Sequence, residues 1–403
     1  MSKIEFGNKF FEKTLIDTES GIYIEKWEIL ADELGLNSSN KCKIKKYRLY
    51  GGLSDCVDLL EVNNGRLSFI IVLTRGMGIW KGSFEDIYLG WNSPIKSPVH
   101  PHFINLEARG GLGWLDGFNE WIVRCGIGNI GVPGLDVITD NMGRKKKVML
   151  TLHGKIANIP ASKVNIKVNL NLPHELIVNG IVYERSMFGS NFKLDTNTVT
   201  SLDSNSLKII DTIENVRSTL DEIQMLYHCN FGPPLLEEGA RLIAPIKEVI
   251  PRDLRSAENV KEFNVFGSPE VGFVEQVYFI KLLGAQNGQT LVMLENKERD
   301  KAVSITFSLK DLPCFTLWKN TSSLEEGYVV GLEPGTSYPN HKAFERKWGR
   351  VIKLEPKGIY KAELEFSIHV GKEKVQNVEE KVKALSKGVE PKIFNKPRKG
   401  FSY

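Results

Sequence analysis

The 403-residue chain is poor in the features that mark several common classes of protein. Its five cysteines are scattered and form no Cys-x-x-Cys pair, which excludes a zinc ribbon and a dithiol redox motif. No stretch approaches the roughly 18 consecutive apolar residues that a membrane-spanning helix needs. Lysine and arginine number 53 and aspartate and glutamate 49, so the net charge of +4 is too small to imply a nucleic acid or a membrane surface as partner. We therefore expect a neutral or weakly charged ligand.

The N-terminal residues carry charge and lack the apolar run and the small-residue cleavage site of an export signal. We therefore expect a cytoplasmic protein.

Alternation of apolar and polar residues recurs along most of the chain. Residues 164–171 and 360–368 alternate in this way, as expected of strands with one buried face. Other short runs are rich in β-branched and aromatic residues and are separated by turn-forming residues. The pattern predicts an all-β protein, a large antiparallel sandwich with a few short helices. The further predicted strands include Gln276–Ile280, Thr290–Leu294, Val303–Phe307 and Tyr328–Leu332.

Apolar residues fall at helical spacing in two windows, at about 25–35 and 374–386, and we expect helices there. The last residues, 387–403, combine lysine, arginine and proline with few apolar side chains. Because runs of charge are usually solvated, we expect a basic tail that is solvated or contacts another subunit, rather than one that binds a polyanion.

Residues 76–133 differ from the rest of the chain. They are dense in glycine, tryptophan and proline and alternate weakly, which indicates a long loop system on a rigid β scaffold. The four tryptophans of this region either stack on sugar rings or belong to the core. They are Trp80, Trp91, Trp114 and Trp121, and we expect the glycine-flanked Trp114 to be the most exposed.

Three titratable residues lie in contexts suited to proton transfer. His153, in Leu-His-Gly-Lys, and His228, in Tyr-His-Cys-Asn-Phe, can exchange protons near neutral pH. Glu333 follows an apolar strand and precedes Pro-Gly. A carboxylate at the end of a buried strand is held rigidly and partly desolvated, as a general base requires. An ordinary glutamate at a strand terminus is the alternative.

These segments resemble, in order and rough spacing, motifs of the aldose 1-epimerases, or galactose mutarotases. The segments that carry this resemblance are Leu152–Lys155, Leu226–Phe231 and Val330–Pro334. Further segments are similar to an uncharacterised branch of mutarotase-like proteins: Thr74–Ile79, Gly113–Phe118, Arg124–Ile127, His153–Ala161 and Leu226–Leu235.

The resemblance covers roughly residues 50–370. We therefore expect an N-terminal extension (1–50), a mutarotase-like domain (51–370), and a C-terminal helix with the basic tail (371–403).

The resemblance implies a β-supersandwich and ring opening by acid/base catalysis. Carried over by motif, His228 is the acid that protonates the ring oxygen, Glu333 is the base that takes the anomeric hydroxyl proton, and His153 binds and polarises the sugar. This chemistry requires no metal or nucleotide, so we expect no cofactor. Lys155 and Tyr227 stand where many epimerases have other residues, which indicates altered substrate contacts.

Seven further residues are predicted to contact the sugar. Arg75 and Arg124 could bind a carboxylate, sulfonate or phosphate on a modified sugar. The loop histidines and acids, Asp116 among them, could form a metal site instead. The seven predicted contacts are Arg75, His100, His102, Trp114, Glu120, Arg124 and Lys155.

Three interpretations of function remain open at this stage. The first is an isomerase that interconverts the anomers of a free or modified aldose. The second is a lyase or hydrolase that acts at or next to the anomeric carbon of an oxidised or unusual glycoside. The third is a carbohydrate-binding protein without catalysis. Each implies a small carbohydrate as partner, with no nucleic acid or membrane, and each leaves a homo-oligomer open.

Overall fold

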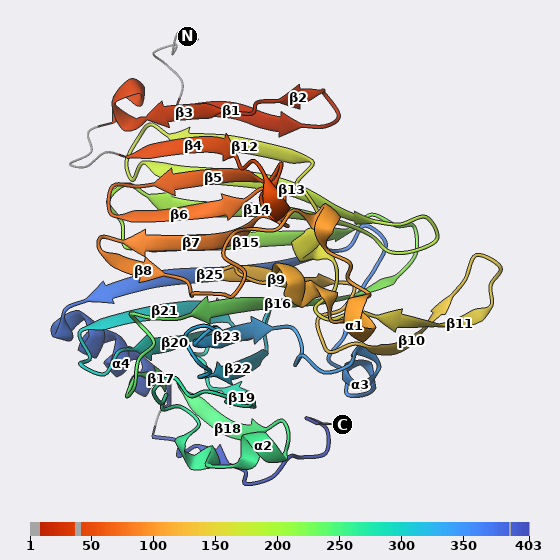
Figure 1. Cartoon of the computed structure of the whole chain (residues 1–403), viewed down its shortest axis with the longest axis vertical. Helices are drawn as coiled ribbons and strands as arrows, with labels where there is room; N and C mark the ends of the chain where they lie inside the picture. Colours follow the sequence, from red (N-terminus) through yellow and green to blue (C-terminus); the bar gives the residue numbers. More distant parts are fainter. Residues whose placement is uncertain (1–8, 37–41, 387, 403) are drawn as a thin grey trace.

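The computed structural model describes residues 9–36, 42–386 and 388–402, and two large sheets dominate it (Figure 1). Within each sheet, neighbouring strands pair antiparallel, except that β26 is parallel to β18. This confirms the prediction of a large antiparallel β-sandwich. The ten-stranded sheet has the order β17 (Arg241–Ile243), β20 (Gln289–Glu295), β21 (Lys301–Ser308), β25 (Ile359–Val370), β15 (Ser206–Asn215), β14 (Asn191–Ser201), β13 (Glu175–Arg185), β12 (Lys163–Asn169), β1 (Phe10–Asp17), β2 (Ile22–Tyr23).

The second sheet has 14 strands and carries the candidate site. Its order is β26 (Lys392–Ile393), β18 (Ile246–Pro251), β19 (Gln276–Leu282), β22 (Cys314–Asn320), β23 (Val329–Gly335), β16 (Asp221–Phe231), β9 (Ile122–Ile127), β7 (Gly78–Phe84), β6 (Leu67–Val72), β5 (Asp58–Asn63), β4 (Lys43–Arg48) and β3 (Trp27–Leu30), with β24 (Ile352–Leu354) on β16 and β8 (Ile87–Leu89) on β7.

The main core lies between the two sheets. Along β14 and β15 every second residue is buried, which is the period of a strand with one face on the core. Apolar side chains from both sheets fill this space, among them Ile209, Ile213 and Phe366 from one sheet and Tyr227 and Phe231 from the other. The alternation in the sequence therefore records the burial of one face of each strand.

The helix predicted at 25–35 is wrong, whereas the one at 374–386 is confirmed. Residues 27–30 form β3, which pairs with β4, and only a single 3-10 turn follows at Ala31–Leu34. Pairing at the sheet edge therefore prevails over the helical spacing of the apolar residues. The long helix α4 (Lys372–Ser386) buries one stripe, Val375 and Val378, against Met293 and Ala302. The shorter helices are α1 (Ala108–Gly111), α2 (Leu254–Ala257) and α3 (Lys342–Lys347).

The segments expected at the two ends of the chain are parts of the sandwich. From the N-terminal extension, β1 joins the ten-stranded sheet, and β3 and β4 join the other. At the C-terminus, β26 pairs with β18, and the rings of Phe394 and Phe401 pack on a small core cluster that includes Tyr338. The tail is therefore partly packed on the body of the protein through these two rings, whereas its basic side chains are exposed, as expected of solvated charge: Lys392, Lys396, Arg398 and Lys399. Lys387 and Tyr403 lie outside the described residues.

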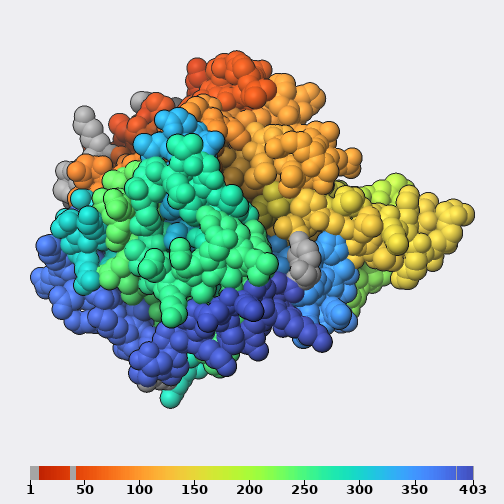
Figure 2. Space-filling view, turned by 60° about the horizontal axis from the view of Figure 1, so that its bottom comes forward, coloured from red at the N-terminus to blue at the C-terminus, as the bar shows by residue number. Residues whose placement is uncertain are grey.

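A β-hairpin stands out from the body of the molecule. It consists of β10 (Gly134–Thr139) and β11 (Lys145–Leu150), and it projects sideways in both Figure 1 and Figure 2. Near its base, Arg346 of α3 donates to both oxygens of Asp136, at 2.8 Å each. The hairpin is an insertion between two residues of the candidate site, Ile130 and His153.

Within the part of the chain that the structure describes, no helix is long and apolar enough to cross a lipid bilayer.

Candidate active site

The centre of the site is a buried pair formed by a histidine and a glutamate on neighbouring strands. His228 of β16 and Glu333 of β23 are 5% and 3% exposed, and His228 Nε2 lies 3.1 Å from Glu333 Oε1. The register that pairs Cys229 with Leu332 brings the two side chains together. The sequence analysis expects Glu333 at the end of its strand, but β23 continues beyond it to Gly335. The strand on both sides holds the carboxyl group more rigidly than a strand end would.

Gly331 leaves the space in which this pair fits. A Cβ atom at this position would lie 2.7 Å from Glu333 Oε1 and 3.1 Å from His228 Cε1. A Cβ contact of 2.7 Å does not occur and one of 3.1 Å is tight, so any side chain at residue 331 would displace the Glu333 carboxyl group.

Asn230 determines which nitrogen of His228 carries a proton. The Asn230 Nδ2 group donates to the carbonyl oxygens of Glu120 and His228, so its Oδ1 is the acceptor that faces His228 Nδ1 at 2.6 Å. Nδ1 is therefore protonated, and a neutral His228 has a bare Nε2. The contact from Nε2 to Glu333 then contains one further proton, on the carboxyl group or on the imidazole.

Burial favours the neutral form of both partners. Desolvation, with a contribution from Glu275, raises the pKa of Glu333 well above its usual value. Desolvation, followed by the neighbouring His153, lowers the pKa of His228 well below its usual value. Because the pair interacts directly, its protons belong to the two groups jointly. A pair that holds one mobile proton can both accept and donate at neutral pH.

His153 lies beside the pair, and its ring centroid is 5.6 Å from that of His228. Its backbone has a φ of 56°, and its Nδ1 donates to the carbonyl oxygen of Ile130 at 2.7 Å. Burial lowers the pKa of His153 to about 4, although the residue keeps some exposed surface. At neutral pH the ring is therefore uncharged, and its Nε2 can accept a hydrogen bond from a ligand hydroxyl.

Aromatic rings enclose the two histidines. The ring centroids of Phe118 and Trp318 lie 5.0 and 5.2 Å from that of His228, and the centroid of Trp114 lies 4.6 Å from that of His153. The expectation that Trp114 is exposed is wrong, because its side chain is fully buried against these rings. Trp114 therefore shapes the back of the site and offers no free face for stacking.

Two polar residues that the sequence analysis missed stand at the edge of the site. Glu275 accepts a hydrogen bond from Trp318 Nε1 at 2.7 Å and from Arg252 Nη2 at 2.9 Å. Glu275 lies near the centre, because the ring of Trp318, which donates to it, lies 5.2 Å from that of His228. Their only signal in the sequence is position, since Arg252 directly follows β18 and Glu275 directly precedes β19.

Two of the predicted sugar contacts, Arg75 and Glu120, form a buried ion pair with each other. Arg75 Nε donates to Glu120 Oε1 at 2.8 Å, and both side chains are fully buried. The Arg75 Nη1 atom also donates to Asn158 Oδ1 at 2.7 Å. The structure therefore places both residues inside the protein as supports of the loop, and we leave them out of the proposed sugar site.

Arg124 is also committed inside the protein. It donates to both carboxylate oxygens of Asp211, at 2.6 and 3.0 Å, and to Thr196 Oγ1 at 2.8 Å. Because Asp211 and Thr196 belong to the ten-stranded sheet, this network joins the two layers of the sandwich. Tyr227 completes it by donating to Asp211 at 2.8 Å. We therefore leave Arg124 out of the sugar site as well.

The remaining predicted contacts are not gathered around the pair. His100 donates its backbone N–H to the carbonyl of Leu53, so it lies beside the turn at Gly52–Ser54, and His102 is exposed. Lys155 is exposed on the segment that follows His153. Among the described residues, no group of three or more histidine, cysteine, aspartate or glutamate side chains is arranged to hold a metal ion. Asp116 instead pairs with Arg109, and Glu120 with Arg75.

The comparisons with known proteins agree with this fold. The structure of a protein from Klebsiella pneumoniae described as a "putative aldose 1-epimerase" is 34% identical to this chain and has a TM-score of 0.91, and the match covers 97% of this chain and 99% of that one. A galactose mutarotase-like protein from Clostridium acetobutylicum has 16% identity and a TM-score of 0.58, with coverage of 81% and 98%. A galactose mutarotase related enzyme from Lactobacillus acidophilus has 12% identity and a TM-score of 0.52, with coverage of 78% and 99%.

The last two similarities show the fold alone. No curated protein matches the chain. The family described as "Domain of unknown function (DUF4432)" matches residues 54–368, which is most of the sequence. The chain therefore belongs to the DUF4432 family, and its fold is that of galactose mutarotase-like proteins.

Proposed function

We propose that the protein is an aldose 1-epimerase-like isomerase, which interconverts the anomers of a sugar by opening and reclosing its ring. The observation that carries the proposal is the buried pair of His228 and Glu333, 3.1 Å apart, which shares one mobile proton. Anomer interconversion needs one general acid and one general base that act on two oxygens of the same carbon. The pair supplies both from adjacent strands.

In this reaction a sugar separates the two groups, with its anomeric centre between them. In the reacting form of the pair, the mobile proton is on His228 Nε2 and Glu333 is ionised. Glu333 takes the proton of the anomeric hydroxyl, and the electrons of that O–H bond form the carbonyl. The bond between the anomeric carbon and the ring oxygen breaks, and the ring oxygen takes a proton from His228 Nε2. Rotation about the neighbouring carbon–carbon bond followed by the reverse steps yields the other anomer. The proton count of the pair is unchanged over the cycle, as a catalyst requires.

The surrounding residues bind and orient the sugar. His153 Nε2 accepts a hydrogen bond from a sugar hydroxyl, and the hydrogen bond from Nδ1 to the carbonyl of Ile130 holds the ring in place. Glu275 and Arg252 are partly exposed at the edge of the site and can pair with further hydroxyls. Trp318 is held by Glu275 and presents an apolar ring beside the pair, a surface suited to the C–H face of a sugar.

The experiment is proton NMR of the anomeric signals of freshly dissolved aldoses and uronic acids. The wild type is compared with Glu333→Gln and His228→Asn, and His369→Gln, in the other sheet, is the matched histidine control. We expect acceleration by the wild type and the control, and a loss of about 10²- to 10⁴-fold in both site variants. Folded wild-type protein that accelerates no free sugar contradicts the proposal. Release of a leaving group from a glycoside would then favour the lyase or hydrolase alternative, and binding without turnover the non-catalytic one.

A further inference from the structure

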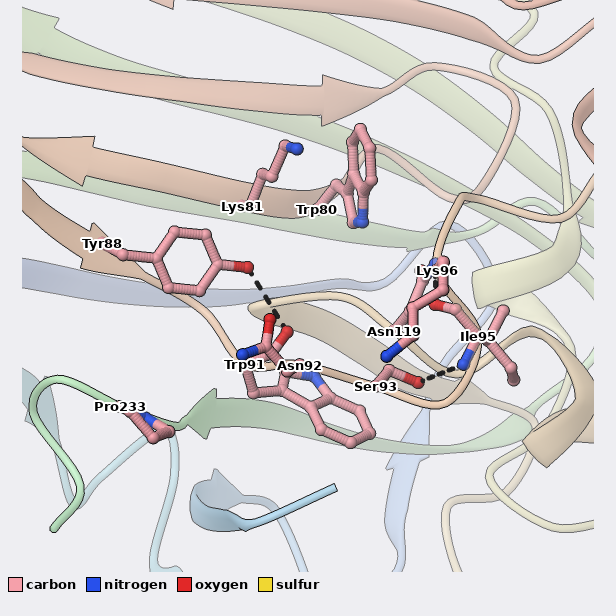
Figure 3. A pocket seen from close by; sticks show the side chains of 10 residues that line it. All are labelled: Trp80, Lys81, Tyr88, Trp91, Asn92, Ser93, Ile95, Lys96, Asn119 and Pro233. Atoms are coloured by element: carbon pink, nitrogen blue, oxygen red, sulfur yellow. Dashed lines mark hydrogen bonds between the residues drawn. The ribbon is translucent and has the colours of Figure 1, made fainter. Parts of the chain in front are cut away.

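A cavity lies on the site-bearing sheet, apart from the buried pair (Figure 3). It has a volume of about 370 Å³, at the lower end of the roughly 300–1,000 Å³ range of small-molecule sites and therefore suited to a single sugar ring. In Figure 3, side chains from β7, β8 and the following loop surround an open space. They are Trp80, Lys81, Tyr88, Trp91, Asn92, Ser93, Ile95, Lys96, Asn119 and Pro233.

A wall of aromatic rings separates this cavity from the proposed active site. Trp91 lines the cavity and packs on Phe118 with a centroid distance of 5.0 Å, and Phe118 in turn lies 5.0 Å from His228. None of the residues assigned above to acid/base chemistry lines the cavity. Trp91 is fixed by a hydrogen bond from its Nε1 to the carbonyl of Glu120, at 3.0 Å. The cavity is therefore a separate space with a rigid partition.

The lining of the cavity combines aromatic rings with positive charge. Trp80, Tyr88 and Trp91 supply apolar surfaces, and the Lys81 ammonium lies 4.0 Å from the centroid of the Trp80 ring. No aspartate or glutamate lines the cavity, whereas Lys81 and Lys96 both do. Two cations without a lining acid favour an anionic ligand.

A buried amide adds a second, independent indication of a ligand. Asn119 is 2% exposed, and its Nδ2 donates to the carbonyl of Ile95 at 3.1 Å. Its Oδ1, in contrast, is buried with no hydrogen-bond partner among the described residues. An unpaired buried acceptor is costly, and a donor such as a sugar hydroxyl entering beside Asn119 would pair it.

We propose that this cavity is a non-catalytic binding site for a monosaccharide unit that carries one anionic group. The ring packs between Trp80 and Trp91, the anionic group pairs with Lys81 and Lys96, and a hydroxyl donates to Asn119. Aromatic surface with a few polar groups is what a pyranose ring requires, because one of its faces is apolar and its edge is polar. A carboxylate, a sulfate or a phosphate would satisfy the same lysines.

The test uses methyl β-D-glucuronide as the probe and methyl β-D-glucoside as its neutral analogue. Both have a blocked anomeric hydroxyl, so neither is a substrate for anomer interconversion and the outcome does not depend on the proposed function. Binding to the full chain is measured by isothermal titration calorimetry and by saturation-transfer NMR. We expect the glucuronide to bind at least about tenfold more tightly than the glucoside, the ratio expected for one hydrogen bond between charged groups.

Variants assign the binding to the cavity. Lys81→Gln, a partly exposed position, should abolish the preference for the glucuronide, and Trp80→Ala should remove binding of both glycosides. Glu333→Gln should leave both affinities unchanged. Circular dichroism establishes that each variant is folded, and Lys96→Gln replaces Trp80→Ala if that variant is not. Equal affinity for the two glycosides, absence of binding, or loss of binding in Glu333→Gln but not in Lys81→Gln each overturns the proposal.

Discussion

Gly331 provides a direct test of the pair, because replacing it with alanine introduces one methyl group between the two catalytic candidates. The added Cβ would lie 2.7 Å from Glu333 Oε1, 3.1 Å from His228 Cε1 and 3.2 Å from Trp318 Cβ. Real Cβ contacts are not shorter than 3.0 Å, so the carboxylate oxygen must move by at least 0.3 Å, the difference between 3.0 and 2.7. The residue's φ lies outside the left-handed region, so the backbone itself tolerates alanine.

Two effects of Gly331→Ala are expected. Overpacking of a well-packed site typically lowers the free energy of unfolding by about 1–3 kcal/mol. Displacement of Glu333 from His228 removes the positioned base, and we expect kcat/KM to fall by about 10²-fold or more. The assays are urea denaturation and NMR of a sugar that the wild type converts.

Gly335, in the same strand, separates these effects. A Cβ there would lie 3.1 Å from the carbonyl of Met225 and 3.2 Å from Leu226 Cβ, so Gly335→Ala crowds the strand without touching the pair. We expect it to lose similar stability and to keep its activity within a few-fold. A readout without substrate is the imidazole nitrogen spectrum of His228, which should change in Gly331→Ala alone. Full activity of folded Gly331→Ala, or equal loss in both variants, would refute the assignment of the pair.

Three further predictions concern stability. Glu120→Gln leaves Arg75 charged and unpaired in the interior, and it should lower the free energy of unfolding by about 3–5 kcal/mol in urea denaturation. Burial lowers the pKa of His153 from 6.5 to about 4, so between these pH values the unfolded chain binds a proton that the folded chain does not. As the pH falls from 6.5 to 4, this group should lower the free energy of unfolding by up to about 1.4 kcal/mol per pH unit. His153→Gln should reduce that slope. His369→Gln is the matched control for this second prediction, because burial also lowers the pKa of His369 to about 4: it should reduce the slope similarly and keep the activity. Phe401→Ala should lower the melting temperature, because the ring packs on the body of the protein.

Each of these predictions has an outcome that contradicts it. Wild-type stability of Glu120→Gln would mean that water reaches the ion pair. An unchanged pH slope in His153→Gln would mean that this ring is already protonated near pH 6 in the folded protein. An unchanged melting temperature in Phe401→Ala would support the solvated tail that the sequence suggested.

Much of the fold could be predicted because strand pairs leave a local record. Along β12 and β25 the alternation reports which side chains face the core, and both strands were expected at nearly their observed bounds. The failure at residues 25–35 has the same origin. Trp27, Leu30 and Leu34 satisfy a helical spacing, but β4 offers a partner strand, and no local pattern reports that partner.

The candidate site was predicted in part. The motifs singled out His153, His228 and Glu333, and the structure brings these three together. The sequence also favours Arg75 and Arg124 as contacts to an anion, which the structure does not bear out. Arg124 is instead bound by Asp211, a residue 87 positions away, which no spacing rule connects to it.

The sequence by itself determined the class of fold, through the period of its apolar residues, and the candidates for proton transfer, through the motifs that contain them. The tertiary structure alone decided which polar residues are free to meet a ligand. Charged side chains such as Arg75 and Arg124 look equally available in a sequence, whereas in the folded protein the cost of burying an unpaired charge commits them to partners from distant strands. The same packing brought Glu275 to the edge of the site and closed Trp114 inside it. Whether a polar side chain is free to meet a ligand depends on packing between distant segments, which local sequence patterns do not report.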